Sequence, residues 1–140
     1  APRRLGRGRD AARYLRSISP GFGPHPPQQR LELSRPVLRP APDGQGLVLH
    51  YDPAIAEPFR TVSADSTASG EAALWQIYDA LRCQVLLLRG RDSDLLDPET
   101  AHDMTQRGPK ARLIQFPDVG HAPTLIAPDQ VAAVHDFLLA

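Results

Sequence analysis

The sequence predicts an α/β fold, in which two parallel strands with flanking helices make up the second half of the chain. An apolar run at residues 84–89 has almost no alternation, which is typical of a strand buried on both faces of a parallel sheet. A helix-like segment and a second apolar run at residues 111–116 follow it. Strand, helix and strand therefore fit within residues 84–116, which is the span of a βαβ unit.

The composition is that of one soluble globular domain. The 140 residues are 41% apolar and 23% charged, and 16 basic residues balance 16 acidic ones. This balance predicts no nucleic-acid and no membrane partner, and no run approaches the roughly 18 apolar residues of a membrane span. The basic residues 1–7 lack the apolar segment of a secretory signal. The one cysteine, Cys83, excludes an internal disulfide and indicates a reducing, cytoplasmic compartment.

The first part of the chain, residues 1–71, is irregular and rich in proline. Its apolar spacing and proline positions predict short helices at residues 10–19, 27–35 and 53–60. Asp10 is the expected N-cap of the first helix. Residues 36–46 are expected to form a turn-rich connector, and residues 47–51 a short extended segment.

The second part, residues 72–140, is more regular. Small polar residues at 61–71 predict a loop, so we place a sub-domain boundary near residue 72. Periodic apolar positions predict a helix over residues 72–82. The next helix is expected to start at Asp97-Pro98 and to end before Gly108, and Pro128-Asp129 opens a last helix.

Acidic residues and a histidine follow the two predicted strands at the edge of the sheet where ligands gather in open α/β folds. Asp92 and Asp94 follow the first strand, and His121 follows the second. Neighbouring parallel strands lie about 4.8 Å apart, so an acid and the histidine can meet. A carboxylate would fix the imidazole tautomer, while the other ring nitrogen takes a proton from a nucleophile. The pattern alone leaves open a turn aspartate and a solvated histidine.

Three strings resemble the C-terminal part of an α/β-hydrolase of the esterase-like subgroup: LLLRGRDSDLL at residues 86–96, PETA at 98–101 and VGHAP at 119–123. The resemblance covers residues 72–140. It implies that Asp94 is the acid and His121 the base of a Ser/Asp/His triad, with Asp92 as the alternative acid. It also implies a small-molecule, ester-like substrate and no cofactor or metal. Residues 1–71, above all 49–56, resemble the cap of that family.

The nucleophile of that family is missing from the sequence. It stands in Gly-x-Ser-x-Gly between a strand and a helix, ahead of the acid, and this string does not occur. None of the serines before Asp94 fits the motif: Ser17, Ser19, Ser34, Ser63, Ser66, Ser69 and Ser93. We therefore expect the C-terminal portion of a hydrolase that is inactive alone.

The open edge of the short sheet suggests a partner. We expect pairing with the missing N-terminal half or self-association through that edge. Two alternatives stay open. The chain is a non-catalytic remnant or interaction module that pairs through the edge, or the complete enzyme uses an upstream Asp nucleophile, as dehalogenase and epoxide-hydrolase relatives do.

The other polar and aromatic residues are expected to have structural roles. His25 is predicted to lie solvated in a turn, and His50 to pack between cap and core. His102 and His135 are expected at exposed helix positions, and no histidine or acid has metal-ligand spacing. Cys83 is expected to be a buried packing thiol. The remaining expectations are a core role for Trp75 and Tyr78 and local ion pairs of Arg89 and Arg91 with Asp92.

Overall fold

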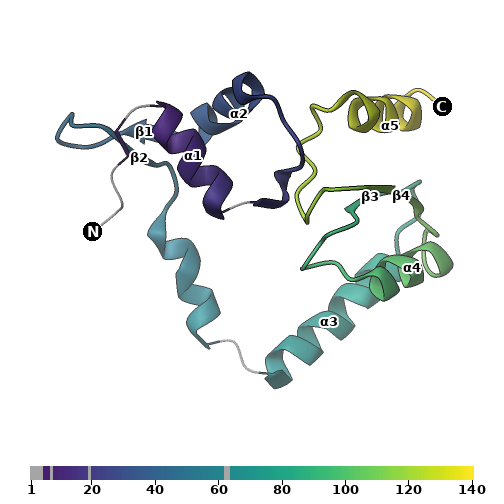
Figure 1. Cartoon of the computed structure of the whole chain (residues 1–140). Coiled ribbons are helices and arrows are strands. Elements are labelled where there is room, and N and C mark those ends of the chain that lie inside the picture. The colour runs from purple at the N-terminus through teal and green to yellow at the C-terminus, as the bar shows by residue number, and fades with distance from the viewer. Residues whose placement is uncertain (1–4, 7, 19, 62–63) are drawn as a thin grey trace.

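The computed structural model describes residues 5–6, 8–18, 20–61 and 64–140 (Figure 1). The α-helices are α1 (Gly8–Ile18), α2 (Pro27–Ser34), α3 (Ala64–Asp79), α4 (Pro98–Gln106) and α5 (Pro128–Leu138). The strands are β1 (Leu38–Pro40), β2 (Leu47–Leu49), β3 (Leu86–Gly90) and β4 (Arg112–Phe116). The 3-10 helices are η1 (Pro20–Phe22), η2 (Arg35–Val37) and η3 (Pro53–Thr61). Ser19, Ser63 and most of the basic N-terminal stretch lie outside the described residues.

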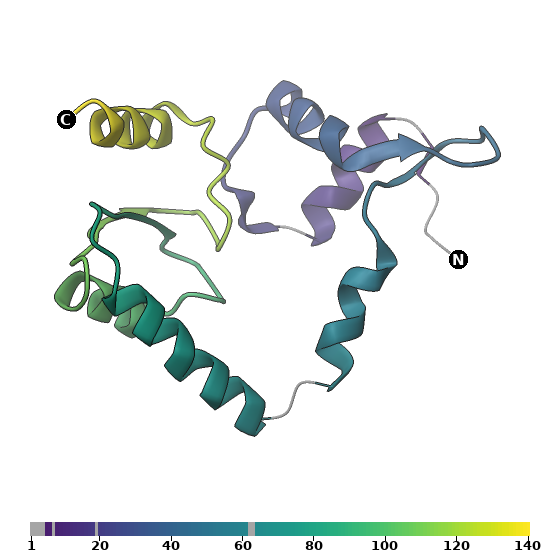
Figure 2. The ribbon, with the colours of Figure 1, turned by 180° about the vertical axis from the view of Figure 1, so that it is seen from behind.

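The second half of the chain has the predicted α/β arrangement. Strands β3 and β4 pair in parallel, from Leu86 opposite Arg112 to Gly90 opposite Phe116. Both views show α3 and α4 on one side of this strand pair and α5 on the other (Figures 1 and 2). The predicted parallel pair and the α/β fold class are confirmed.

Helix α4 begins and ends where its sequence signals predict. The Asp97 carboxylate accepts a hydrogen bond of 2.7 Å from the Thr100 backbone N–H, and Pro98 occupies the first turn. This cap satisfies a donor that the helix itself leaves unpaired. Gly108 follows the last turn with φ at +54°, a conformation that favours glycine. Helix α4 therefore begins and ends within the connection that leads from β3 to β4.

Side chains near the end of α3 attach that helix to α4. The Tyr78 hydroxyl donates to the Met104 carbonyl at 2.6 Å. The Trp75 and Tyr78 rings meet edge to face at 5.7 Å, and the Arg107 guanidinium lies 4.3 Å from the centre of the Trp75 ring. Arg107 also pairs with Asp79, and this hydrogen bond holds the pKa of the Asp79 carboxyl below its ordinary value. The two aromatic residues are half-buried packing residues.

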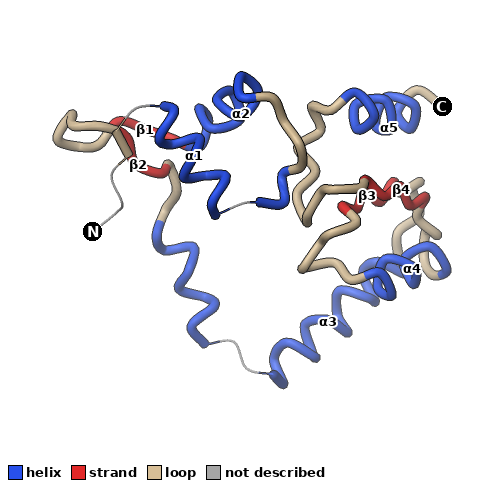
Figure 3. Tube along the Cα trace, viewed as in Figure 1, coloured by secondary structure: helices blue, strands red, loops and turns tan. Residues whose placement is uncertain are grey.

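The first half contains a small hairpin that the sequence did not predict (Figure 3). Strands β1 and β2 pair antiparallel, so the expected connector at residues 36–46 is partly strand. Asp43 accepts a hydrogen bond of 3.1 Å from the Gln45 N–H, and Gly44 and Gly46 have positive φ, so the turn closes tightly. Leu5 adds a bridge to Leu47 and is buried beside the hairpin.

Three local predictions are wrong. The loop expected at residues 61–71 is already helix from Ala64, because α3 extends through this alanine-containing segment once its later turns are formed. Asp10 lies inside the first turn of α1, which begins at Gly8, so it is not the N-cap. Cys83 is exposed, because it lies between α3 and β3, where no described element covers it.

The chain exposes much apolar surface. Its accessible surface is 10196 Å², whereas a compact monomer of this mass exposes roughly 7,100 Å². Leu74 and Ile77 on α3 are 67% and 63% exposed, and Leu95 is 76% exposed. Residues 86–88 of β3 are half-buried rather than covered on both faces. An exposed apolar surface of this size is typical of a site where other protein surface packs.

We predict that the purified 140-residue chain self-associates as its concentration rises, because water is excluded when these apolar side chains meet. Sedimentation velocity over a concentration series would measure this association. Replacing Leu74 and Ile77 together by glutamate should reduce it, and Val37→Glu, which changes an exposed residue far from α3, serves as the control. A chain that stays monomeric at all concentrations would contradict the prediction.

Candidate functional site

The loops that follow β3 and β4 approach each other at a glycine. A Cβ atom on Gly90 would lie 1.9 Å from the Gly120 carbonyl oxygen and 2.2 Å from that of Val119. The Asp92 N–H donates to the Val119 carbonyl at 2.9 Å, and the Arg91 N–H donates to the Phe116 carbonyl at 2.8 Å. Since only glycine allows this approach, Gly90 determines that the acid-bearing loop lies against the histidine-bearing loop.

Asp94 and His121 meet across these two loops. The Asp94 Oδ1 lies 2.9 Å from the His121 Nδ1, and the two side chains are 78% and 50% exposed. The hydrogen bond from His121, with a smaller contribution from the backbone N–H of Asp94, holds the pKa of the Asp94 carboxyl below its ordinary value. The carboxylate accepts the Nδ1 proton in this arrangement, so Nε2 is left as the second ring nitrogen for proton transfer.

Asp92, the alternative acid, contacts the histidine loop only through its backbone. Its side chain is exposed, and its carboxylate forms no hydrogen bond or ion pair with any residue that the structure describes. The carboxylate that reaches His121 is that of Asp94.

Arg89 holds the loop that carries Asp94. Its side chain is 3% exposed, its Nε donates to the Leu96 carbonyl at 2.8 Å, and its Nη1 donates to the Arg91 carbonyl at 3.3 Å and to the Gln115 Oε1 at 3.0 Å. The predicted ion pair with Asp92 is therefore wrong. The sequence signal was an arginine inside an apolar strand, where a buried charge needs several partners.

Two of the described serines, Ser93 and Ser34, form hydrogen bonds with nearby backbone. The Ser93 hydroxyl accepts hydrogen bonds from the N–H groups of Leu95 at 3.4 Å and Leu96 at 3.0 Å. These bonds stabilise the turn at residues 93–96, which contains Asp94. Ser34 is buried and donates to the Leu31 carbonyl at 2.7 Å. Neither hydroxyl contacts His121.

His25 connects the first half of the chain to the loop after His121, which the sequence did not predict. It is 6% exposed, so the expectation of a solvated turn residue is wrong. Its Nε2 lies 2.9 Å from the Phe22 carbonyl and 2.9 Å from the Thr124 hydroxyl. The Gly120 N–H donates to the Gly21 carbonyl at 2.6 Å in the same region. The sequence does not reveal this role, because Thr124 lies 99 positions away from His25.

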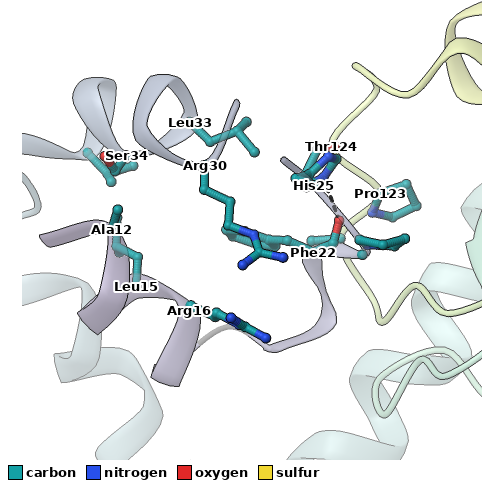
Figure 4. Close-up of a pocket in the computed structure, with 14 residues that line it drawn as sticks. Ala12, Leu15, Arg16, Phe22, His25, Arg30, Leu33, Ser34, Pro123 and Thr124 are labelled. Atoms are coloured by element: carbon teal, nitrogen blue, oxygen red, sulfur yellow. Dashed lines mark hydrogen bonds between the residues drawn. The ribbon is translucent and has the colours of Figure 1, made fainter. Parts of the chain in front are cut away.

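A cavity of about 450 Å³ lies where these two parts meet (Figure 4). Residues of α1 and α2 form one side, and Ala122, Pro123 and Thr124, which directly follow His121, form another. Its volume falls within the roughly 300–1,000 Å³ of small-molecule sites. No pattern in the sequence predicts this cavity, because its walls come from residues separated by about a hundred positions.

The remaining histidines do not take part in this arrangement. His50 is exposed, so its predicted packing between cap and core is wrong, and His102 and His135 are exposed as predicted. The described residues contain no group of three or more His, Cys, Asp or Glu that could hold a metal ion. Within the same part of the chain, every helix is too short or too polar to cross a membrane.

Known proteins similar to this chain are hydrolases. A 3-hydroxybutyrate-oligomer hydrolase of Cupriavidus necator is 45% identical over 126 residues, which are 89% of this chain and 43% of the relative. A pimeloyl-[acyl-carrier protein] methyl ester esterase of Nitrosomonas europaea is 47% identical over 55 residues, 39% of this chain and 21% of the esterase. No protein-family model matches the chain.

Solved structures show the same likeness. The crystal structure of an alpha/beta hydrolase from Novosphingobium aromaticivorans has a TM-score of 0.77 and 31% identity, over 98% of this chain and 47% of that structure. The chain thus spans less than half the length of the relatives that it matches.

We predict that Gly90→Ala lowers the free energy of unfolding by more than about 2 kcal/mol, because the new methyl group would collide with two backbone carbonyl oxygens. Gly70→Ala is the matched control. It adds a methyl group in open space on α3 and should raise the free energy of unfolding by about 0.5–1 kcal/mol. Urea unfolding followed by circular dichroism measures both. Equal effects would show that the two loops do not meet at Gly90.

We also predict that His121→Ala raises the pKa of the Asp94 carboxyl toward its ordinary value of 3.8, because the main hydrogen bond to the carboxylate is removed. Because the pKa is lowered in the folded chain, this hydrogen bond stabilises the fold at pH values above the ordinary pKa of the carboxyl. The stabilisation is lost as the pH falls through the lowered pKa. Carboxyl ¹³C NMR titration measures the change. Asp97, whose pKa is lowered by Thr100, should keep its pKa in the variant. An unchanged Asp94 pKa would mean that the two side chains do not pair in solution.

Proposed function

The chain belongs to the α/β-hydrolase superfamily, and we propose that it supplies the acid and the histidine of a Ser/Asp/His triad for ester hydrolysis. The observation that carries the proposal is the 2.9 Å contact between Asp94 and the Nδ1 of His121 at the carboxyl ends of β3 and β4. This is the edge of the sheet at which open α/β folds place their reacting groups.

The two residues have complementary roles in this proposal. Asp94 accepts the Nδ1 proton of His121, fixes the ring and stabilises the imidazolium that forms later. The Nε2 of His121 takes the proton of a serine hydroxyl as its oxygen attacks the ester carbonyl, and then gives that proton to the leaving alcohol. The same nitrogen then takes a proton from a water molecule, whose oxygen attacks the carbonyl of the acyl-enzyme. The bond to the serine oxygen breaks, the acid product leaves, and Nε2 returns the proton to the serine. No metal or cofactor is needed for this sequence of steps.

The serine nucleophile comes from sequence outside this chain. Gly-x-Ser-x-Gly is absent from the 140 residues, and the described serines near the site bind backbone groups. The chain alone should therefore be inactive. The exposed apolar surface of α3 and the free edges of the two-stranded sheet support docking of the half that carries the nucleophile. Self-association through the same edge is the alternative.

The substrate that we propose is a short oligoester of a hydroxy acid such as 3-hydroxybutyrate. The support is the 45% identity, over 89% of this chain, to a hydrolase named for 3-hydroxybutyrate oligomers.

We assign residues 1–71 to a cap and residues 72–140 to the core, with the cavity between the cap helices and the loop after His121. Helix α3 crosses this boundary, so a continuous helix joins cap and core, and the two parts would move together. One exposed cysteine supports a cytoplasmic location.

The test is an assay of the chain alone and after fusion to the part of the Cupriavidus necator relative that lies outside the aligned region. Hydrolysis of an aryl ester and of the 3-hydroxybutyrate dimer is expected only in the fusion. In the fusion, Asp94→Asn should lower kcat about ten-thousandfold, because the ring of His121 is no longer held in the required tautomer. His121→Ala should lower kcat about a millionfold, because it removes the group that transfers the proton.

Asp92→Asn is the matched control for Asp94→Asn, since it changes a neighbouring exposed carboxylate that does not contact the histidine. Its kcat should stay near that of the unsubstituted fusion. Two results would overturn the proposal. One is turnover by the chain alone that His121→Ala abolishes, which would place the nucleophile within these residues. The other is an active fusion that keeps its kcat in both the Asp94 and His121 variants.

A further inference from the structure

The cavity beside the His121 loop has two arginines in its wall. Arg16 comes from α1 and Arg30 from α2, and Figure 4 shows both side chains directed toward the same space, with His25 and Thr124 beyond it. Apolar side chains, among them Leu15, form much of the remaining wall, and the described residues that line the cavity include no aspartate or glutamate. A cavity with this wall attracts an anion that also has an apolar part.

Neither arginine has a partner among the residues that the structure describes. Arg16 and Arg30 form no ion pair and no hydrogen bond there, and Arg30 is half-buried. The same two residues also line a neighbouring depression with Arg13, so the positive charge continues along the α1–α2 groove. Like charges that converge without a counter-charge repel each other, and a bound anion removes this repulsion.

A carboxylate is the anion that fits both the arginines and the apolar wall. The planar guanidinium group donates two parallel hydrogen bonds to a carboxylate, and these charge-assisted bonds are stronger than those between neutral groups. The opposite wall consists of Ala122, Pro123 and Thr124, which directly follow His121. A ligand held at the arginines by one end would therefore extend along this wall toward the histidine.

We propose that Arg16 and Arg30 bind the free carboxylate end of the ester substrate, so that this cavity selects linear oligoesters that end in an acid. This inference rests on the proposed function and names the group that determines its specificity. The arginines select and position the substrate, and they do not take part in proton transfer. A neutral ester of the same length would fill the apolar part of the cavity but leave both guanidinium groups unpaired.

Binding to the 140-residue chain tests the inference without turnover. The probes are the linear 3-hydroxybutyrate dimer with its free carboxylate and the methyl ester of that dimer, titrated by calorimetry into the His121→Ala chain, in which hydrolysis cannot occur by the proposed route. The acid is expected to bind at least about tenfold more tightly than its methyl ester, the usual effect of a charge-assisted hydrogen bond. Arg16→Gln and Arg30→Gln should each weaken acid binding about tenfold and leave ester binding unchanged.

Control variants separate this effect from general charge and from folding. Arg39→Gln removes the same charge from an exposed residue of β1 that lines none of the cavities near α1, and it should bind the acid like the parent chain. Arg30→Lys keeps the charge but loses the planar group, so its affinity should fall between those of the parent and Arg30→Gln. Circular dichroism and the thermal unfolding midpoint show whether each variant is folded.

Three results would overturn the inference: equal binding of acid and methyl ester, an equal loss of affinity in Arg39→Gln, or no binding of either probe. Each leaves the proposed hydrolysis standing, because that proposal is tested by the kcat of the Asp94 and His121 variants in the fusion. Conversely, a fusion that keeps its kcat in both the Asp94 and His121 variants, together with arginine-dependent acid binding, would overturn the proposed triad but keep the carboxylate site.

Discussion

The close packing of three backbone segments around Gly120 is the constraint on which the site depends. Gly90 brings the end of β3 against Val119 and Gly120, with no space for a Cβ atom between them. On its other side Gly120 meets Gly21, where a Cβ atom would lie 2.7 Å from the Gly21 Cα. The loop that carries Asp94, the loop that carries His121 and the segment at Gly21 therefore take their positions from one contact between backbones.

The sequence predicts the part of the fold that has local signals. The pairing of β3 with β4 and the start of α4 follow from apolar runs, Asp97 and Pro98, all of which act within a few residues. The hairpin of β1 and β2 is local, but each of its strands has only three residues, which is too few to show an alternating pattern. The burial of His25 and the cavity depend on residues far apart in the chain. Such contacts leave no periodic trace in a single sequence, which is why they were missed.

For the candidate site, too, the sequence predicted the residues that have local signals and missed the others. Its Asp94–His121 contact was expected from two strand ends, because parallel strands bring their carboxyl ends to one edge. The resemblance favoured Asp94 over Asp92 as the acid, and it is the Asp94 carboxylate that lies against His121 in the structure. Arg16 and Arg30 are unremarkable in a chain with 16 basic residues. Only the convergence of α1 and α2 distinguishes them.

Arg89 binds backbone carbonyl groups of the loop that carries Asp94. Two of its hydrogen bonds end on the carbonyl oxygens of Arg91 and Leu96, at the two ends of the segment that contains Asp94. Since every residue has a carbonyl group, these two hydrogen bonds do not depend on which side chains lie between them. An insertion or deletion, in contrast, would move one of the two carbonyl groups away from the guanidinium. Arg89 thus constrains the length of the loop, whereas Ser93 and Asp94 constrain its sequence.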